Sequence, residues 1–258
     1  MLAGVTSDMT AACPLRAVPQ TTFASRIGSV YATAQTTAQS FLRFFNVGDV
    51  RDGKVTLTLA DSLSGRELGT WTSAIIPPHS SQQVAVATIE AQAGIKGPKS
   101  PTYVIRVRSQ LGLQSGFLQH VVWRPGDGTL TNMSTCDDGV TTLPLQLNNI
   151  HSKVLTDQYP STIVVTNTGR EAKAYSIRIA HSGTGLFYGR YIGPSVPSMG
   201  ASQFVSSSLE AAAPFILTTN TAHYNVEEET FFPGFLQHLV LNKRAGVLTD
   251  LTTVCRMN

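Results

Sequence analysis

Apolar and polar residues alternate along several short segments of this chain. The clearest are residues 54–59 and 102–108, where apolar side chains recur at every second position. A period of two is typical of a β-strand with one buried face. Shorter runs rich in β-branched and aromatic residues indicate further strands, which we expect at residues 25–31, 41–45, 84–87, 162–165, 174–179 and 203–205.

Glycine and proline separate these segments. Pairs such as Asp52-Gly53 and Ser64-Gly65 mark turns, and turn signals recur roughly every 10–15 residues, a spacing typical of an all-β sandwich or barrel. Helix-like patches occur only at residues 88–95 and 208–213, and we expect each to form a short helical turn between sheets. The pattern therefore predicts an all-β fold.

A long internal repeat divides the chain. The pentapeptide Gly-Phe-Leu-Gln-His occurs at residues 116–120 and again at 234–238. Further ordered matches lie at offsets of about 118–123 residues, a length that suits a whole domain rather than a solenoid unit. These matches include Asn46 with Asn167, Trp71 with Tyr191, Glu90 with Glu210, Tyr103 with Tyr224, and 27–29 with 150–152. We therefore expect two similar domains, residues 1–136 and 137–258, each with about 7–8 strands.

Composition narrows the function classes. Charged residues make up 14% of the chain and the net charge is +3, against a usual charged share of about 25%. The sequence has no basic run, which argues against a nucleic-acid partner, and no apolar stretch approaches the roughly 18 residues of a membrane span. The first 13 residues have neither a basic nor an apolar signal region. We expect a secreted, periplasmic or cell-surface protein whose signal peptide has been removed.

Candidate catalytic groups are few. His120 and His238 occupy equivalent places in the repeat, and we interpret them as strand residues whose polar groups bond across a sheet. No Cys-x-x-Cys or His-x-His pair indicates a metal site, and no Gly-x-Ser-x-Gly elbow indicates a hydrolase. For the equivalent Glu90 and Glu210 we expect capping or salt bridging. The sequence therefore gives no catalytic, cofactor or metal residue.

Three other features leave alternatives open. Residues 105–108 are basic where the equivalent residues 226–229 are acidic, so these are either two solvated strands or complementary surfaces that join domains or subunits. The unmatched aromatic residues Trp123, Tyr188 and 231–232 suit core packing, or a platform for a surface glycan. The tripeptide Asn-Met-Ser at residues 132–134 is a glycosylation sequon that matters only in a eukaryote.

The chain also resembles a known group of proteins. The segments 41–46, 68–73, 88–90 and 116–120 together resemble uncharacterised two-domain exported proteins of bacteria. The resemblance covers nearly the whole chain. It implies export and a tandem of antiparallel immunoglobulin-like sandwiches, and it implies no function or functional residue.

Three cysteines, Cys13, Cys136 and Cys255, follow the repeat. A disulfide between the two ends of either domain would need Cys136, so at most one domain can have such a bond. A two-fold relation between the domains would instead bring Cys13 to Cys255, the pairing that we favour, with Cys136–Cys255 next. Three reduced thiols would indicate an intracellular location.

These observations predict a non-enzymatic extracytoplasmic protein, structural or adhesive, which could be a subunit of a bacterial surface assembly. Its partners would be other proteins or further copies of itself, joined through open sandwich edges. The alternative is a carbohydrate- or ligand-binding module. An enzyme is a third class, and it requires a cleft with at least two titratable groups within hydrogen-bond reach.

Overall fold

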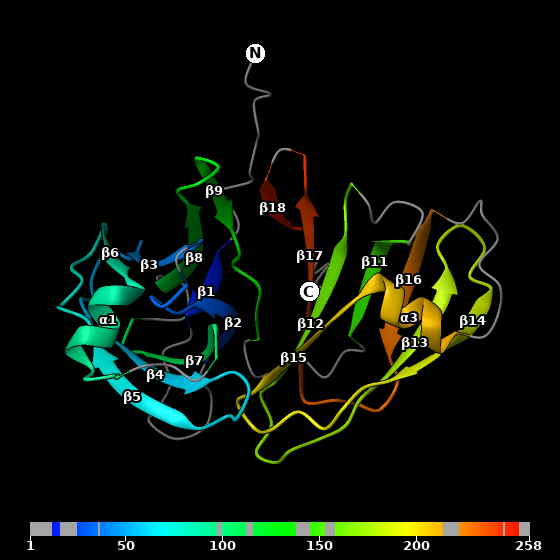
Figure 1. Ribbon diagram of the computed structural model, residues 1–258. Helices are drawn as coiled ribbons and strands as arrows, with labels where there is room; N and C mark the ends of the chain where they lie inside the picture. Colours follow the sequence, from blue (N-terminus) through cyan, green and yellow to red (C-terminus); the bar gives the residue numbers. More distant parts are fainter. Residues whose placement is uncertain are drawn as a thin grey trace. The chain divides into compact units, whose positions relative to one another are not determined.

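The computed structural model describes residues 12–15, 25–35, 37–96, 100–111, 116–137, 145–152, 158–213, 222–244 and 246–252. The chain forms two compact units, one built mainly from residues 5–141 and the other mainly from residues 142–258. We call them the first and second sandwich. Within the described residues, each contains two antiparallel sheets and one short helix (Figure 1). The all-β class and the two-sandwich architecture expected from the sequence are confirmed.

The first sandwich consists of two five-stranded sheets. One has the order β1-β8-β3-β6, with β9 also paired to β8, and the other has the order β10-β2-β7-β4-β5. The strands are β1 (Cys13–Leu15), β2 (Ser25–Tyr31), β3 (Gln39–Asn46), β4 (Val55–Asp61), β5 (Glu67–Thr72), β6 (Ser80–Ala85), β7 (Thr102–Ser109), β8 (Gly116–Arg124), β9 (Thr129–Asn132) and β10 (Cys136–Asp137).

The second sandwich repeats this plan with two four-stranded sheets, β11-β16-β13-β14 and β15-β12-β17-β18. Its described part has no counterpart of the short strands β1 and β10, which carry cysteines in the first sandwich. The strands are β11 (Gln146–His151), β12 (Ser161–Asn167), β13 (Ser176–His181), β14 (Phe187–Ile192), β15 (Ala201–Val205), β16 (His223–Glu228), β17 (Gly234–Asn242) and β18 (Val247–Asp250).

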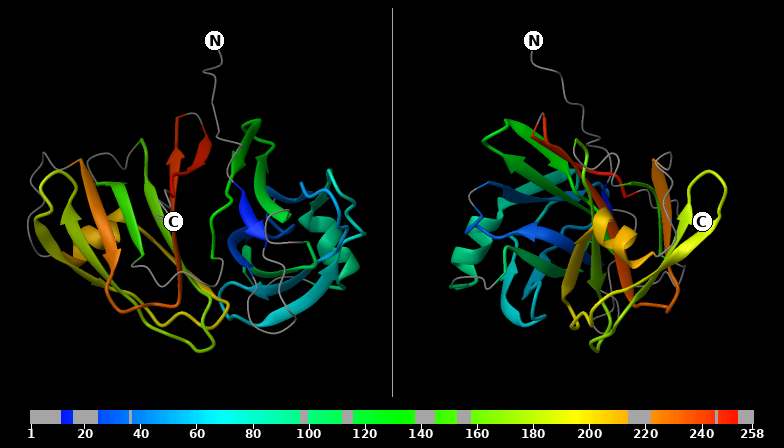
Figure 2. Two further views of the ribbon diagram at one scale, coloured as in Figure 1. Left: turned by 180° about the vertical axis from the view of Figure 1, so that it is seen from behind. Right: turned by 45° about the vertical axis from the view of Figure 1, so that its right-hand side comes forward.

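Each helix connects the two sheets of its own sandwich (Figure 2). Helix α1 (Val86–Gln92) follows β6 directly and packs against β3 and β6 of one sheet and β5 of the other. Helix α3 (Ser206–Ala212) follows β15 and packs against β12 and β14. The two helix-like patches of the sequence are therefore helices, each beginning two residues earlier than expected.

Alternating side chains build the two cores, as the period-two pattern requires. On β3, Leu42 and Phe44 point inward and are fully buried, and the intervening residues are partly exposed. The corresponding inward pair on β12 is Ile163 and Val165. Burial of such side chains contributes about 1.5–3 kcal/mol each, so this alternation is the main source of stability in both sandwiches.

Each sandwich has a β-bulge near its start, and the two bulges show which residues of the two repeats correspond there. The pairing of β2 with β7 shifts between Ile27 and Val30, and that of β11 with β16 shifts between Leu147 and Ile150. Both bulges hold a residue with positive φ, Ser29 in the first and Asn149 in the second. Residues 27–29 therefore correspond to 147–149, and their match to 150–152 was wrong. The shared bulge fixes this alignment, because it lies at the same place in both pairings.

Candidate functional site

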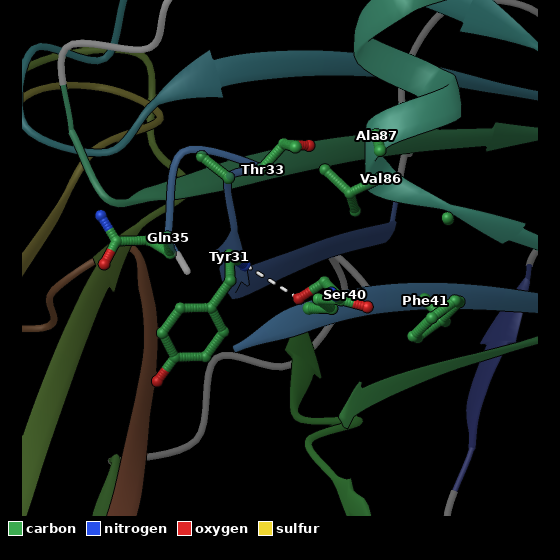
Figure 3. Close-up of a pocket in the computed structure, with 10 residues that line it drawn as sticks. Tyr31, Thr33, Gln35, Ser40, Phe41, Val86 and Ala87 are labelled. Atoms are coloured by element: carbon green, nitrogen blue, oxygen red, sulfur yellow. Dashed lines mark hydrogen bonds between the residues drawn. The ribbon is translucent and has the colours of Figure 1, made fainter. Parts of the chain in front are cut away.

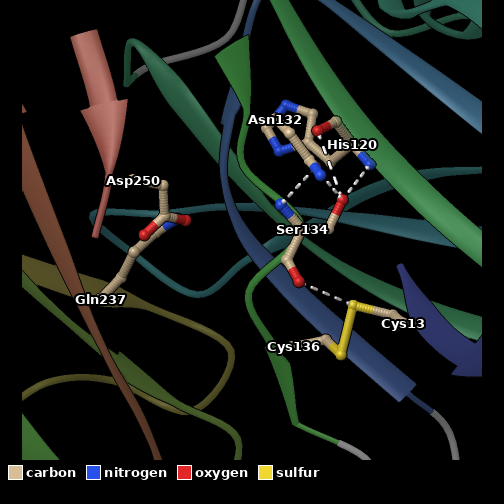
Figure 4. The surroundings of a disulfide bond; sticks show 7 residues. All are labelled: Cys13, His120, Asn132, Ser134, Cys136, Gln237 and Asp250. Atoms are coloured by element: carbon tan, nitrogen blue, oxygen red, sulfur yellow. Dashed lines mark hydrogen bonds between the residues drawn. A yellow bond between two sulfur atoms is a disulfide. The ribbon is translucent and has the colours of Figure 1, made fainter. Parts of the chain in front are cut away.

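A disulfide joins the two sheets of the first sandwich. Cys13 lies on β1, which pairs with β8, and Cys136 lies on β10, which pairs with β2 in the opposite sheet. Their Cα atoms are 6.1 Å apart (Figure 4), within the range that a disulfide spans. The expected pairing of Cys13 with Cys255 is therefore wrong. Cys255 lies outside the described residues.

The two repeated histidines bond to serines on neighbouring strands. His120 Nε2 lies 2.8 Å from Ser40 Oγ, and His238 Nε2 lies 2.8 Å from Ser161 Oγ. All four side chains are buried. Sequence reasoning found the histidines and missed the serines, although the serines are themselves 121 residues apart in the repeat.

Each serine oxygen is also engaged by the backbone. The Tyr31 amide donates to Ser40 Oγ at 2.9 Å, and the His151 amide donates to Ser161 Oγ at 3.1 Å. Burial lowers the pKa of His120 to about 4 and, together with the charge of His151, lowers that of His238 to about 4. Both imidazoles are therefore neutral at neutral pH.

This geometry differs from a catalytic serine–histidine pair. A general base needs a third group to orient and stabilise its protonated form, and no described carboxylate oxygen hydrogen-bonds to either imidazole. Both serines are buried, and each already accepts a hydrogen bond from a backbone amide. The two pairs connect strands inside each sandwich.

A second repeated bond attaches each helix to the opposite sheet. The Tyr103 hydroxyl donates to Glu90 Oε1 at 2.7 Å, and the Tyr224 hydroxyl donates to Glu210 Oε1 at 2.7 Å. Burial and the adjacent carboxylate raise the pKa of both phenols. Neither helix has a side-chain hydrogen bond at its N-cap, so of the two expected roles capping is wrong, and salt bridging stays a prediction.

The sequon is part of a third repeated motif. Asn132 Oδ1 accepts hydrogen bonds from the Ser134 amide at 3.2 Å and from its hydroxyl at 2.5 Å, and Ser134 Oγ accepts one from the His120 amide at 3.0 Å (Figure 4). In the second sandwich Asp250 and Thr252 make the same bonds beneath His238. Asp250 and Thr252 form these hydrogen bonds without a sequon. The Asn-Met-Ser sequence is therefore explained by the turn that it stabilises.

Several charged side chains of residues 105–108 and 226–229 form ion pairs within their own sandwiches. Arg106 pairs with Glu67 at 3.0 Å in the first sandwich. In the second, Glu227 lies 3.7 Å from Arg178, and Glu229 lies 2.6 Å from Arg190. The interpretation of the two segments as complementary surfaces stays a prediction.

The aromatic residues separate into packed and exposed groups. Trp71, Tyr103, Tyr188, Tyr224 and Phe232 are buried, and Trp123 is half-buried. Phe231, by contrast, is 87% exposed and has a φ of 51°. Its expected core packing is wrong, because the left-handed backbone at Phe231 turns its ring outward while Phe232 enters the core.

A pocket of about 370 Å³ opens at one end of the first sandwich. It is bounded by the end of β2, the loop into β3, the start of β3 and the junction of β6 with α1 (Figure 3). The lining residues are Tyr31, Ala32, Thr33, Gln35, Gln39, Ser40, Phe41, Ala85, Val86 and Ala87. Its volume falls within the range of small-molecule sites, about 300–1,000 Å³.

Two further features concern the part of the chain that the structure describes. There, no three histidine, cysteine, aspartate or glutamate side chains come together as metal ligands, and neither helix has the length and apolar character needed to cross a membrane. Comparison of the chain with models of known protein families gives no match, and comparison with curated proteins gives no significant one.

Proposed function

We propose that this chain is a non-enzymatic structural or adhesive protein of an extracytoplasmic bacterial surface. The disulfide between Cys13 and Cys136 is the observation that carries the proposal, because such bonds persist in oxidising compartments. The buried histidines, serines and tyrosines support it further, since they hold strands and helices together in both sandwiches.

The edge strand β14 supports association with other proteins. It ends the sheet β11-β16-β13-β14, so among the described strands none pairs with one row of its backbone groups. Phe187 and Ile192 on this strand are 41% and 68% exposed. The equivalent positions on β5 hold Glu67 and Thr72, polar residues typical of an edge that avoids pairing. The contrast favours β14 as the edge to which another strand adds.

Cell fractionation, size-exclusion chromatography and electron microscopy of the native protein test this function. We expect surface association and species larger than one chain. Ile192→Lys should shift the protein towards monomer, and the matched change Thr72→Lys on β5 should not. A protein that remains monomeric and never associates with cells or other proteins would overturn the proposal.

The second candidate function is a carbohydrate- or ligand-binding module. The observation that favours it is the pocket at the end of the first sandwich, whose lining mixes polar and apolar side chains. It is compatible with the first function, because an adhesive surface protein can act by binding a ligand.

A further inference from the structure

The pocket lining selects against charged ligands. Of the ten lining residues, Tyr31 alone carries an ionisable side chain, and burial raises the pKa of its phenol while the charge of Arg124 acts in the opposite direction. Arg124 is itself paired with Asp127 at 3.0 Å. A charged ligand would lose its hydration without gaining a counter-ion, so the pocket favours a neutral molecule.

The lining nevertheless offers several hydrogen-bonding groups. Within the described part of the chain, the side chains of Thr33, Gln35 and Gln39 form no hydrogen bonds with other residues. Each of these groups can both donate and accept. Ser40 differs, because its hydroxyl is already bonded to the Tyr31 amide and to His120. A ligand with hydroxyl groups in several directions would match the two amides and the Thr33 hydroxyl.

Apolar surface completes the lining. Phe41, Val86, Tyr31 and three alanines lie around the pocket together with these polar residues (Figure 3). A sugar ring has the complementary character, with C–H groups on its faces and hydroxyls at its rim. The volume of 370 Å³ corresponds to about twelve water molecules at ~30 Å³ each, which is room for one sugar ring and its water rather than for a long oligosaccharide.

The duplication shows that this lining is not required by the fold. Residues that hold the sandwich together are retained, as Ser40 is in Ser161. Other lining residues are replaced: Phe41 corresponds to Thr162 and Tyr31 to His151, because each pair occupies the same register in its sheet. Val86 and Ser206, each the first residue of its helix, differ in the same way. The fold therefore does not require these three lining residues.

We propose that this pocket binds a single neutral sugar ring, as a free monosaccharide or as the terminal unit of a surface glycan. The inference rests on the second of the two functions proposed above. It gives the ligand-binding role a location between β2, β3 and α1 and a chemical class of ligand.

Calorimetry and saturation-transfer NMR on the full chain provide the test. The probes are glucose, galactose, mannose and N-acetylglucosamine, with sialic acid as the charged control and cyclohexanol as the apolar control. We expect at least one neutral sugar to bind, with sialic acid and cyclohexanol at least about tenfold weaker. Absence of binding by all four neutral sugars up to about 50 mM would overturn the proposal, as would a preference for sialic acid or cyclohexanol.

Variants locate the binding. Phe41→Thr introduces the residue that the second sandwich already carries there, and it should weaken the sugar by about tenfold or more. Gln39→Ala changes an exposed side chain, so it should keep the fold and also weaken binding. Thr162→Phe in the second sandwich is the matched control and should leave affinity unchanged. Binding that survives both pocket variants would place the ligand elsewhere and refute the site. Surface association is measured separately, so failure of this site and failure of the structural role are distinguishable.

Discussion

At the residue scale, one buried asparagine in each sandwich hydrogen-bonds to the loops beside the end of its strand. Asn46 Nδ2 donates to the Arg51 and Ile76 carbonyls at 2.7 and 3.1 Å, and Asn167 Nδ2 donates to the Glu171 and Val196 carbonyls at 2.8 and 2.9 Å. The sequence marks both asparagines as turn residues through Asn-x-Gly. It does not show that one amide fixes two distant carbonyls, because that requires the loop to fold back over the strand end.

We therefore expect Asn167→Asp to destabilise the second sandwich although the side chain keeps its size. The change replaces a donor with an acceptor that faces two carbonyl oxygens, and it introduces a buried charge. The cost should be about 3 kcal/mol, measured as a fall in the urea midpoint. The control Asn148→Asp alters an exposed residue and should be near neutral; equal effects of the two substitutions would contradict this account.

The neutral histidines predict a dependence of stability on pH. An unfolded histidine titrates near pH 6.5, whereas the pKa values of His120 and His238 are about 4. The unfolded chain therefore takes up protons first as the pH falls from 6.5 towards 4, and folding free energy present above pH 6.5 is lost across that window. Each histidine should account for about 3 kcal/mol.

Denaturant unfolding at several pH values measures this loss. In His120→Gln the dependence of the first sandwich on pH between 6.5 and 4 should be smaller, and in His238→Gln that of the second. A pH profile identical to that of the unsubstituted protein in both variants would show that other groups control acid stability.

At the scale of strands and helices, the sequence predicts those strands that are long enough to show alternating apolar and polar residues. Strands β4 and β7 follow from period-two patterns, and β2 has the expected bounds, Ser25–Tyr31. The strands β1 and β10 were not expected, because two or three residues cannot show a period. The pocket was not expected either. Its lining comes from strand ends and a loop, and only the folded chain brings Thr33 and Gln35 near Val86.

The repeated pentapeptide begins with glycine in both copies because a Cβ atom at that position would collide with neighbouring atoms. A Cβ atom on Gly234 would lie 1.9 Å from the carbonyl oxygen of Thr166 on the neighbouring strand β12. Backbone cannot move by that amount without breaking the pairing of β12 with β17, so Gly234→Ala should cost about 3 kcal/mol or more.

Thermal unfolding of Gly234→Ala checks this expectation. Gly116→Ala should cost less, because its nearest neighbour is a side-chain atom of Leu111 at 2.8 Å. Gly126 has no atom within 4 Å of the corresponding position, so Gly126→Ala is the control and should be close to neutral. A neutral Gly234→Ala would mean that the pairing of β12 with β17 tolerates a shift.

At the scale of the whole molecule, the disulfide should stabilise the two sandwiches unequally. It closes a segment of 123 residues around the first sandwich, and such a closure contributes about 4–5 kcal/mol. Reduction, or Cys13→Ser with Cys136→Ser, should lower the unfolding temperature of the first sandwich and leave the second unchanged. Differential scanning calorimetry with and without reductant measures this. Non-reducing peptide mapping should recover Cys13 linked to Cys136; recovery of Cys13 linked to Cys255 would contradict the assignment.

The same bond has a mechanical consequence. When tension is applied to the chain outside residues 13 and 136, the force passes through the disulfide, and the enclosed segment cannot lengthen. Oxidation thus keeps on the order of 400 Å of chain out of reach of a pulling force, and the second sandwich alone can extend. Single-molecule pulling should record one unfolding step in the oxidised protein and an additional, longer extension after reduction. The first sandwich would then keep its shape, and its pocket, under loads that unravel the rest of the molecule.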